Sequence, residues 1–174
     1  MWGSNVFFNS FISNARGLAV LIKDDANLDN LTSENIIPGN YSKLSMTAGN
    51  KRILPKCIYT LNEDSKPEDE EHESTCFFRT VFNDDNEDGY EHKVITGDFN
   101  VALKHNKDMC GYLHVYNPHS KDKMKMNLGS LVDIWRERNP TGRQFTFDKR
   151  QERNQTRAKL DYFLVSENST ENIG

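Results

Sequence analysis

The sequence predicts a single domain of the α/β or α+β class, in which strands are mixed with two helices. Apolar runs of strand length occur at residues 16–23, 93–97 and 159–166. Two other segments, residues 77–82 and 121–136, place apolar residues at helical spacing. The chain has 174 residues, which is enough for one ordinary domain but too few for two.

The composition is that of a domain with much solvated surface. Hydrophobic residues make up 36% of the chain and charged residues 28%, and the mean hydropathy is −0.77. A net charge of −4 excludes a protein held to nucleic acid by bulk positive charge, but it allows a nuclease with an acidic site. We expect no transmembrane helix, because no run of 18 apolar residues occurs. Three widely spaced cysteines and no basic N-terminal leader predict an intracellular protein, nuclear or cytoplasmic and not secreted, with reduced thiols.

The first sixty residues predict three strands. Residues 16–23 read as a buried strand after a glycine, and the turn signal Pro38–Asn40 follows. Residues 41–46 alternate apolar and polar side chains, as a half-buried strand does. Residues 52–59 form the third strand, in which Pro55 predicts a sheet edge or a bulge.

Two acidic segments predict mobile loops. Seven of the eleven residues in 63–73 are Asp or Glu, and residues 84–91 form a second acidic run. Such segments repel themselves and cannot bury apolar area. A short helix is predicted between them, capped by Ser74 or Thr75.

The second half predicts three strands and the longer helix. The strands are residues 93–97, 144–147 and 159–166, and the helix runs from about Lys121 to Arg136. We find no internal repeat and no clear linker, so residues 1–174 are expected to form one domain.

The segment I-T-G-D-F-N, residues 95–100, has the side chains needed for hydrolysis. Alternation places Asp98 and Asn100 on one side of the chain and Phe99 on the other. The carboxylate could orient or deprotonate a water, and the amide could donate to a phosphate oxygen or to that carboxylate. Taken alone, G-D-x-N is more often simply a turn.

Three further segments have both structural and functional interpretations. Tyr59 and Asn62 follow a predicted strand, where sites of layered α/β folds usually lie, although a packed aromatic and a turn asparagine are the commoner explanation. Asp133 and Arg136 are three residues apart and are expected to pair on the surface of a helix. Asp161 falls within an apolar strand, where a carboxylate must be paired or belong to a site.

The order of these four segments is more informative than any one of them. Y-x-x-N, G-D-F-N, L-V-D-I-W-R with F-T-F, and K-L-D-Y-F-L-V-S together resemble the endonuclease/exonuclease/phosphatase superfamily. The likeness runs over most of the chain and is greatest to the endonuclease domain that precedes reverse transcriptase in LINE-type retrotransposons.

The resemblance implies a four-layer α/β sandwich of the DNase I-like type, with two packed mixed sheets flanked by helices, and Mg²⁺-dependent cleavage of a phosphodiester in DNA. By the same resemblance, Tyr59 would support the phosphate and its leaving group, and Asn62 would contact the nucleic-acid backbone. Asp98 would orient or activate the attacking water, and Asn100 would hold the phosphate or position Asp98. Asp161 would orient the family's catalytic histidine.

Other parts of the family's site have no match in this sequence. The family's early strands carry an Asn and the metal-binding Glu, and its last motif, S-D-H, supplies an Asp and the His. No histidine follows Asp161 here. We therefore expect an incomplete domain, truncated at both ends, that binds Mg²⁺ poorly and is inactive alone. The alternative is a non-catalytic remnant of the fold that binds nucleic acid or a protein partner.

Overall fold

The computed structural model describes residues 2–11, 17–60, 73–83, 89–111, 118–151 and 154–172. Asn62, residues 63–72 and residues 84–88 lie outside these ranges, so the expectations for the substrate contact and for most of the two acidic loops stay predictions.

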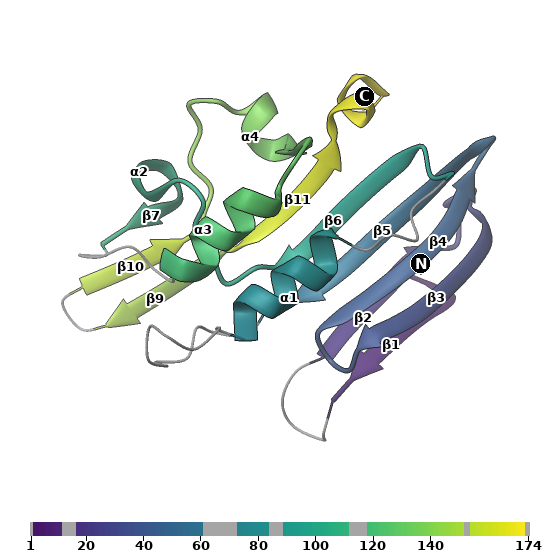
Figure 1. Ribbon diagram of the computed structural model, residues 1–174, viewed down its shortest axis with the longest axis horizontal. Coiled ribbons are helices and arrows are strands. Elements are labelled where there is room, and N and C mark those ends of the chain that lie inside the picture. Colours follow the sequence, from purple (N-terminus) through teal and green to yellow (C-terminus); the bar gives the residue numbers. More distant parts are fainter. Residues whose placement is uncertain are drawn as a thin grey trace.

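A six-stranded mixed sheet forms the centre of the structure (Figure 1). Its order is β3-β4-β5-β6-β11-β8; β5 and β6 are parallel, and the other neighbours are antiparallel. The predicted α/β class with mixed sheets is confirmed. The strands are β3 (Asp29–Ile37), β4 (Tyr41–Ala48), β5 (Lys51–Tyr59), β6 (His92–Asp98), β8 (Leu131–Asp133) and β11 (Asp161–Ser166).

Two helices cover one face of this sheet and pack against each other: α1 (Glu73–Phe82) and α3 (Pro118–Asn127). Parallel strands need a crossover connection, and α1 lies in the connection between β5 and β6. α1 begins at Glu73, so Ser74 and Thr75 lie in its first turn and not before it, where the expected cap would be.

The opposite face carries a hairpin of β1 (Trp2–Ser10) and β2 (Gly17–Lys23), which packs on β5. Ile22 is buried there against Leu44, Met46 and Cys57 of the sheet. Side chains of β2 on its other side are exposed, so the expectation of a buried strand holds for one face only. The described residues thus form three layers: helices, the main sheet and the hairpin.

A second small sheet, of order β7-β10-β9, extends the molecule beyond β11 (Figure 1). Residues 144–146 are not in a strand, so the strand expected over 144–147 begins only at its last residue. The remaining elements are α2 (His105–Asp108), β7 (Met109–Cys110), α4 (Ile134–Arg138), β9 (Phe147–Gln151), β10 (Asn154–Ala158) and the 3-10 helix η1 (Glu167–Asn172).

The single long helix predicted for residues 121–136 is wrong. The chain leaves α3 at Asn127, turns at Gly129 with φ of 55°, and then forms the edge strand β8 and the short helix α4. The apolar residues at helical spacing are divided among three elements, α3, β8 and α4, because Leu131–Asp133 pairs with β11.

Pro55 lies in an interior strand, so the edge position that it predicted is wrong. β5 is flanked by β4 and β6. Its ladder with β4 continues in one register on both sides of the proline, from Lys43–Lys56 to Met46–Ile53, with no partners recorded between these pairs. Proline has no N–H to donate to a ladder and is usually confined to edge strands or bulges, so Pro55 is an exception to that rule.

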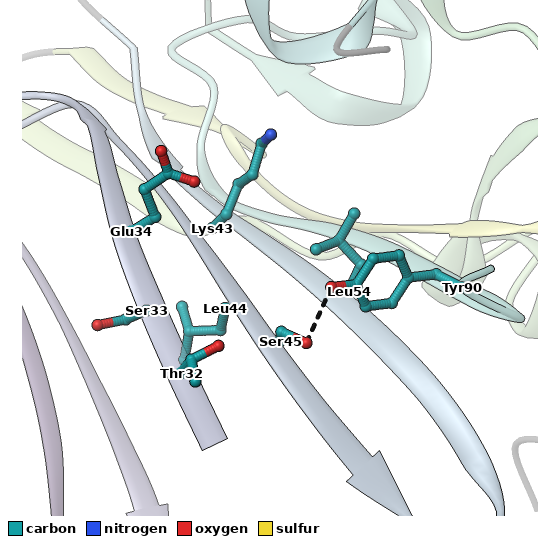
Figure 2. Close-up of a pocket in the computed structure, with 8 residues that line it drawn as sticks. All are labelled: Thr32, Ser33, Glu34, Lys43, Leu44, Ser45, Leu54 and Tyr90. Atoms are coloured by element: carbon teal, nitrogen blue, oxygen red, sulfur yellow. Dashed lines mark hydrogen bonds between the residues drawn. The ribbon is translucent and has the colours of Figure 1, made fainter. Parts of the chain in front are cut away.

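A polar groove of about 190 Å³ lies on β3 and β4, on the face that also carries α1 (Figure 2). The Tyr90 hydroxyl donates to Ser45 Oγ at 2.9 Å, and the Arg52 guanidinium lies 4.4 Å from the Tyr90 ring centroid. The backbone N–H of Glu91 also donates to the Arg52 carbonyl at 3.0 Å. These contacts attach the end of the second acidic segment to the sheet.

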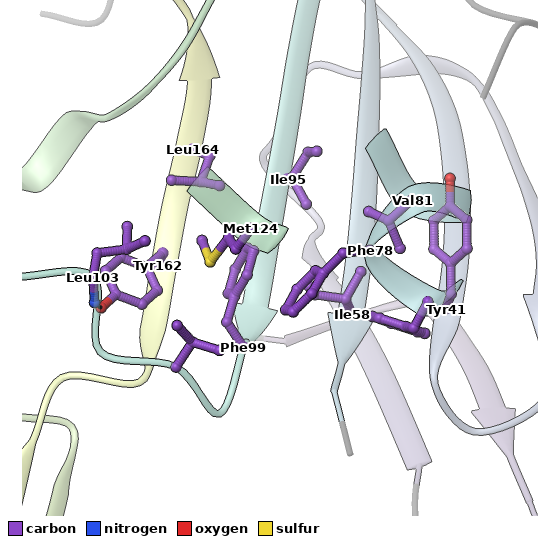
Figure 3. Close-up of a cluster of buried hydrophobic side chains, with 12 residues drawn as sticks. Tyr41, Ile58, Phe78, Val81, Ile95, Phe99, Leu103, Met124, Tyr162 and Leu164 are labelled. Atoms are coloured by element: carbon purple, nitrogen blue, oxygen red, sulfur yellow. Dashed lines mark hydrogen bonds between the residues drawn. The ribbon is translucent and has the colours of Figure 1, made fainter. Parts of the chain in front are cut away.

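The main hydrophobic core fills the space between the sheet and the two helices (Figure 3). Phe99 stacks on Phe78 of α1 at 6.4 Å between ring centroids and meets the Tyr162 ring edge-on at 5.4 Å. No disulfide joins the three cysteines, of which Cys57 is buried and Cys76 and Cys110 are exposed. No helix in the described part of the chain is long and apolar enough to cross a membrane.

Asn9 of β1 attaches the hairpin to the turn between β3 and β4. Its side chain is buried, and its Nδ2 donates to the carbonyls of Ile37 and Tyr41 and to Ser42 Oγ, all within 3.0 Å. Its Oδ1 accepts from the Gly39 backbone N–H at 2.6 Å. One buried amide therefore lies within hydrogen-bond distance of four polar groups of this turn and of β4, among them the Gly39 N–H.

We predict that Asn9→Ala lowers the free energy of unfolding by about 3 kcal/mol, since buried groups without partners each cost about 1–3 kcal/mol. Asn35→Ala is the matched control, because Asn35 also joins β3 to β1 through the Phe8 carbonyl but is exposed. It should cost about 1 kcal/mol or less. Urea unfolding followed by circular dichroism measures both, and equal losses would contradict the assignment of Asn9.

We also predict that the folded chain binds the apolar dye ANS. Phe8 and Leu21, on the outer side of the hairpin, are 69% and 48% exposed, and Phe163 of β11 is 61% exposed. Replacing Phe8 and Leu21 by serine should reduce dye fluorescence, because exposed apolar patches bind such ligands. Met126→Ser, on α3, is the control for a single exposed apolar side chain. Wild-type fluorescence no higher than that of the double variant would contradict the prediction.

Candidate active site

Three of the five predicted site residues are neighbours on adjacent strands. Tyr59 ends β5, Asp98 ends β6 and Asp161 begins β11. Tyr59 is the register partner of Asp98, and Asp98 is the register partner of Asp161. Directly opposed residues project from the same face of a sheet, about 5 Å apart at Cβ in antiparallel pairs. The register therefore brings a phenol and two carboxylates into one row.

This row lies on the face of the sheet that carries the hairpin. The adjacent residues Ile58 and Tyr162 belong to the core on the helix side, and successive strand residues alternate between faces. Asp98 is half-buried, but Asp161 is exposed. The expectation of a carboxylate inside an apolar strand is thus wrong for Asp161, because β11 begins at this residue.

The bend after β6 requires the glycine of G-D-F-N. Gly97 has φ of 135°, and a Cβ at this position would lie 1.9 Å from the Ile58 carbonyl oxygen. Phe99 is fully buried in the core, as its predicted orientation away from Asp98 requires. Asn100 has φ of 48°, a left-handed conformation that asparagine tolerates better than most residues.

Asn100 holds this bend with both its backbone and its side chain. Its N–H donates to Asp98 Oδ1 at 2.8 Å, and its Nδ2 donates to the Thr60 carbonyl at 2.5 Å. The Thr60 N–H in turn donates to the Asp98 carbonyl at 2.8 Å. The sequence anticipated a bond from Asn100 to the carboxylate, but it is the backbone, not the amide, that makes it. Thr60 was not identified from the sequence, because a single threonine after a strand has no distinctive pattern.

Asn40, in the turn between β3 and β4, fixes the backbone of Tyr59. Its Nδ2 donates to the Tyr59 carbonyl at 2.5 Å, and the Tyr59 N–H donates to the Asn40 carbonyl at 2.9 Å. The sequence indicated only a turn at this position. The turn is also the one that Asn9 holds, so the hairpin and Tyr59 share a continuous set of hydrogen bonds.

Thr146 contacts the backbone that leads into Asp161. Its Oγ1 accepts from the N–H groups of Leu160 and Asp161 at 3.0 and 3.2 Å. Its own N–H donates to the Ala158 carbonyl at 2.9 Å. The sequence assigned this threonine only to a short strand.

Asp133 and Arg136 do not form the surface ion pair that their spacing predicted. Asp133 caps α4 by accepting from the Arg136 N–H at 3.2 Å, and its other oxygen lies 2.5 Å from Lys159 Nζ. The Arg136 guanidinium instead lies 2.5 Å from Asp108, and both of those side chains are buried. The first of these ion pairs holds Lys159, which lies two residues before Asp161, and the second joins α4 to α2.

Burial raises the pKa of the Asp98 carboxyl above its ordinary value. The hydrogen bond from the Asn100 N–H lowers it, and the negative charge of Asp161 raises it further. A carboxylate whose pKa is raised is a better proton acceptor than an ordinary aspartate. The same neighbours that place Asp98 thus also suit it to act on a water.

The described residues do not by themselves make a divalent-metal site. Among them, no three side chains of His, Cys, Asp or Glu are close enough to hold an ion, and Asp98 and Asp161 supply only two adjacent carboxylates. Mg²⁺ needs near-ideal octahedral oxygen coordination, so the ligands beyond these two carboxylates would have to come from water, from substrate phosphates or from other segments.

No protein-family model matches the chain. It is 23% identical over 171 residues to an uncharacterized 149 kDa protein of transposon TX1 from Xenopus laevis. The alignment covers 95% of this chain but only 12% of that protein.

Solved structures match the chain over nearly its whole length. The endonuclease domain of TRAS1, a telomere-specific non-LTR retrotransposon, gives a TM-score of 0.63 at 16% identity, covering 96% of this chain and 68% of that one. An AP endonuclease from Archaeoglobus fulgidus gives 0.65 at 16% identity, covering 95% and 68%. The fold is therefore the DNase I-like fold of such endonucleases, as the sequence motifs indicated.

We predict that Asp98→Asn stabilises the chain at neutral pH. Because the pKa of Asp98 is raised on folding, the folded chain binds more protons than the unfolded chain between the two pKa values, and stability falls as pH rises through that window. Asparagine removes the charge and keeps an oxygen for the Asn100 N–H.

The increase in the free energy of unfolding caused by Asp98→Asn should therefore be present at pH 7 and become smaller as the pH falls to 3. Thermal unfolding at both values measures it. Asp98→Ala is the comparison, because it removes the acceptor as well as the charge and should be less stable than Asp98→Asn. A gain of the same size at both pH values would argue against a raised pKa.

Proposed function

We propose that this chain, which has the fold of the endonuclease/exonuclease/phosphatase superfamily, is part of a retrotransposon-derived DNA endonuclease that hydrolyses a phosphodiester. The observation that carries the proposal is the row of Tyr59, Asp98 and Asp161 across β5, β6 and β11. The likeness in fold to the TRAS1 retrotransposon endonuclease domain and to an AP endonuclease supports it.

In the proposed reaction, Asp98 orients a water and accepts its proton as the oxygen attacks phosphorus. Its burial and the charge of Asp161 favour proton acceptance. Asn100 keeps the Asp98 carboxylate in one orientation through its backbone N–H. Tyr59, on the same face, donates a hydrogen bond from its phenol to a phosphate oxygen. As the water oxygen bonds to phosphorus, the P–O bond to the leaving oxygen breaks, and that oxygen takes a proton from solvent.

Two roles depend on groups that the described residues do not supply. Asp161 is exposed beside Asp98, and from the family likeness we assign it to orient a catalytic histidine, a residue that does not occur after Asp161 in this sequence. Asn62 would contact the nucleic-acid backbone. Mg²⁺, when bound, would supply charge to the phosphate, and its carboxylate ligand is likewise expected from another segment.

We predict that the isolated 174-residue chain does not detectably nick supercoiled plasmid in Mg²⁺. Residues of one site act as a unit, so removing part of a site removes most of its effect. Gel electrophoresis of plasmid incubated with the chain is the measurement. Nicking that EDTA and Asp98→Ala both abolish would contradict this prediction while supporting the catalytic role of Asp98.

The positive test adds the missing parts. A chimera that joins this chain to the terminal segments of the TRAS1 endonuclease domain should nick plasmid. Asp98→Ala in the chimera should reduce the rate by about 10²–10⁴-fold, the usual contribution of a general base. Asp122→Asn, an exposed residue of α3, is the control that should leave the rate unchanged. A folded chimera that binds DNA but does not cut it would favour a non-catalytic, nucleic-acid-binding remnant of the fold.

A further inference from the structure

The hydroxyl of Thr146 accepts two backbone hydrogen bonds at the start of β11. The donors are the N–H groups of Leu160, at 3.0 Å, and Asp161, at 3.2 Å. A threonine oxygen has two lone pairs, so one hydroxyl can satisfy both donors. Thr146 is itself placed by the bond from its N–H to the Ala158 carbonyl.

The other side of the same segment is bonded to the G-D-F-N bend. The Phe99 N–H donates to the Leu160 carbonyl at 2.9 Å, and Asp161 is the register partner of Asp98. Leu160 is therefore held from two directions, by Thr146 and by the residue that follows Asp98. Thr146 lies fifteen residues from Asp161 in the chain, and within the described ranges no other side chain bonds to the Asp161 N–H.

This arrangement lies at the point where the two carboxylates are neighbours. Asp161 is exposed and is the first residue of its strand, so the ladder continues on one side of it only. Two negative charges at neighbouring positions repel, and their interaction weakens as the distance between them grows. A strand end that must stay close to a like charge needs an additional restraint, and the Thr146 hydroxyl is placed to provide it.

We propose that Thr146 is a positioning residue that sets the spacing between the carboxylates of Asp98 and Asp161. The proposal deepens the proposed function, because this pair belongs to the candidate active site. Its test needs neither DNA nor metal, so its failure would leave the proposed reaction standing, and an inactive chimera would leave this proposal standing.

The test is a carboxyl ¹³C NMR titration of Asp98 in the full chain. Asp161→Asn removes the neighbouring charge and should lower the pKa of Asp98. Thr146→Val removes the hydroxyl at nearly constant volume and should lower the pKa of Asp98 by part of that amount, because the carboxylates separate. Thr146→Ser keeps the hydroxyl and should leave the pKa as in the wild type.

The double variant Thr146→Val with Asp161→Asn distinguishes two explanations for a lowered pKa of Asp98: a displaced Asp161 carboxylate, and a general loss of structure around Asp98. If Thr146 acts through Asp161, the double variant should titrate like Asp161→Asn alone. An equal further decrease in the double variant would overturn the proposal, as would an unchanged or increased pKa in Thr146→Val. Thr146→Ala replaces the valine variant in both measurements if valine prevents folding, and the same outcomes decide.

Discussion

The close contact between Gly97 and the Ile58 carbonyl is the constraint on which the candidate site depends. A side chain at position 97 would overlap that oxygen, so β5 and β6 can remain paired to their ends only with glycine there. That pairing makes Tyr59 and Asp98 register partners, and the pairing of β6 with β11 adds Asp161. Three groups that are far apart in sequence become neighbours because one position lacks a Cβ.

Buried polar side chains, rather than apolar packing, fix the loops around this row. Asn9 holds the turn that contains Asn40, Asn40 holds the backbone of Tyr59, and Asn100 holds that of Thr60. Each of these asparagines is almost fully buried, and each satisfies backbone groups that lie outside regular ladders. Such bonds add modestly to stability when made and cost more when removed, so they specify loop geometry more than they drive folding.

One face of the main sheet is packed in the hydrophobic core, and the other carries the carboxylates of the candidate site. The helix face holds the main aromatic core, in which Phe99 and Tyr162 pack together. The hairpin face holds Asp98 and Asp161, which immediately precede these two aromatic residues in sequence. Because successive residues point to opposite faces, each aromatic side chain packed in the core is preceded by a carboxylate on the hairpin face. The packing of Phe99 and Tyr162 therefore helps to place Asp98 and Asp161.

The sequence by itself determined four strands of the main sheet, β4, β5, β6 and β11, as well as the G-D-F-N bend and the family likeness, because these depend on local alternation and on one glycine. It did not indicate β3 or β8, the two edge strands. Only the tertiary structure decided how the rest is used. Leu131–Asp133 has helical spacing but is a strand because β11 offers it a partner, and Pro55 is interior because β4 and β6 both lie beside it. Asp133 and Arg136 are three residues apart in sequence, yet each forms an ion pair with a residue more than twenty positions away. Residues distant in the chain supply these partners, and a local pattern carries no information about which distant groups folding will bring close.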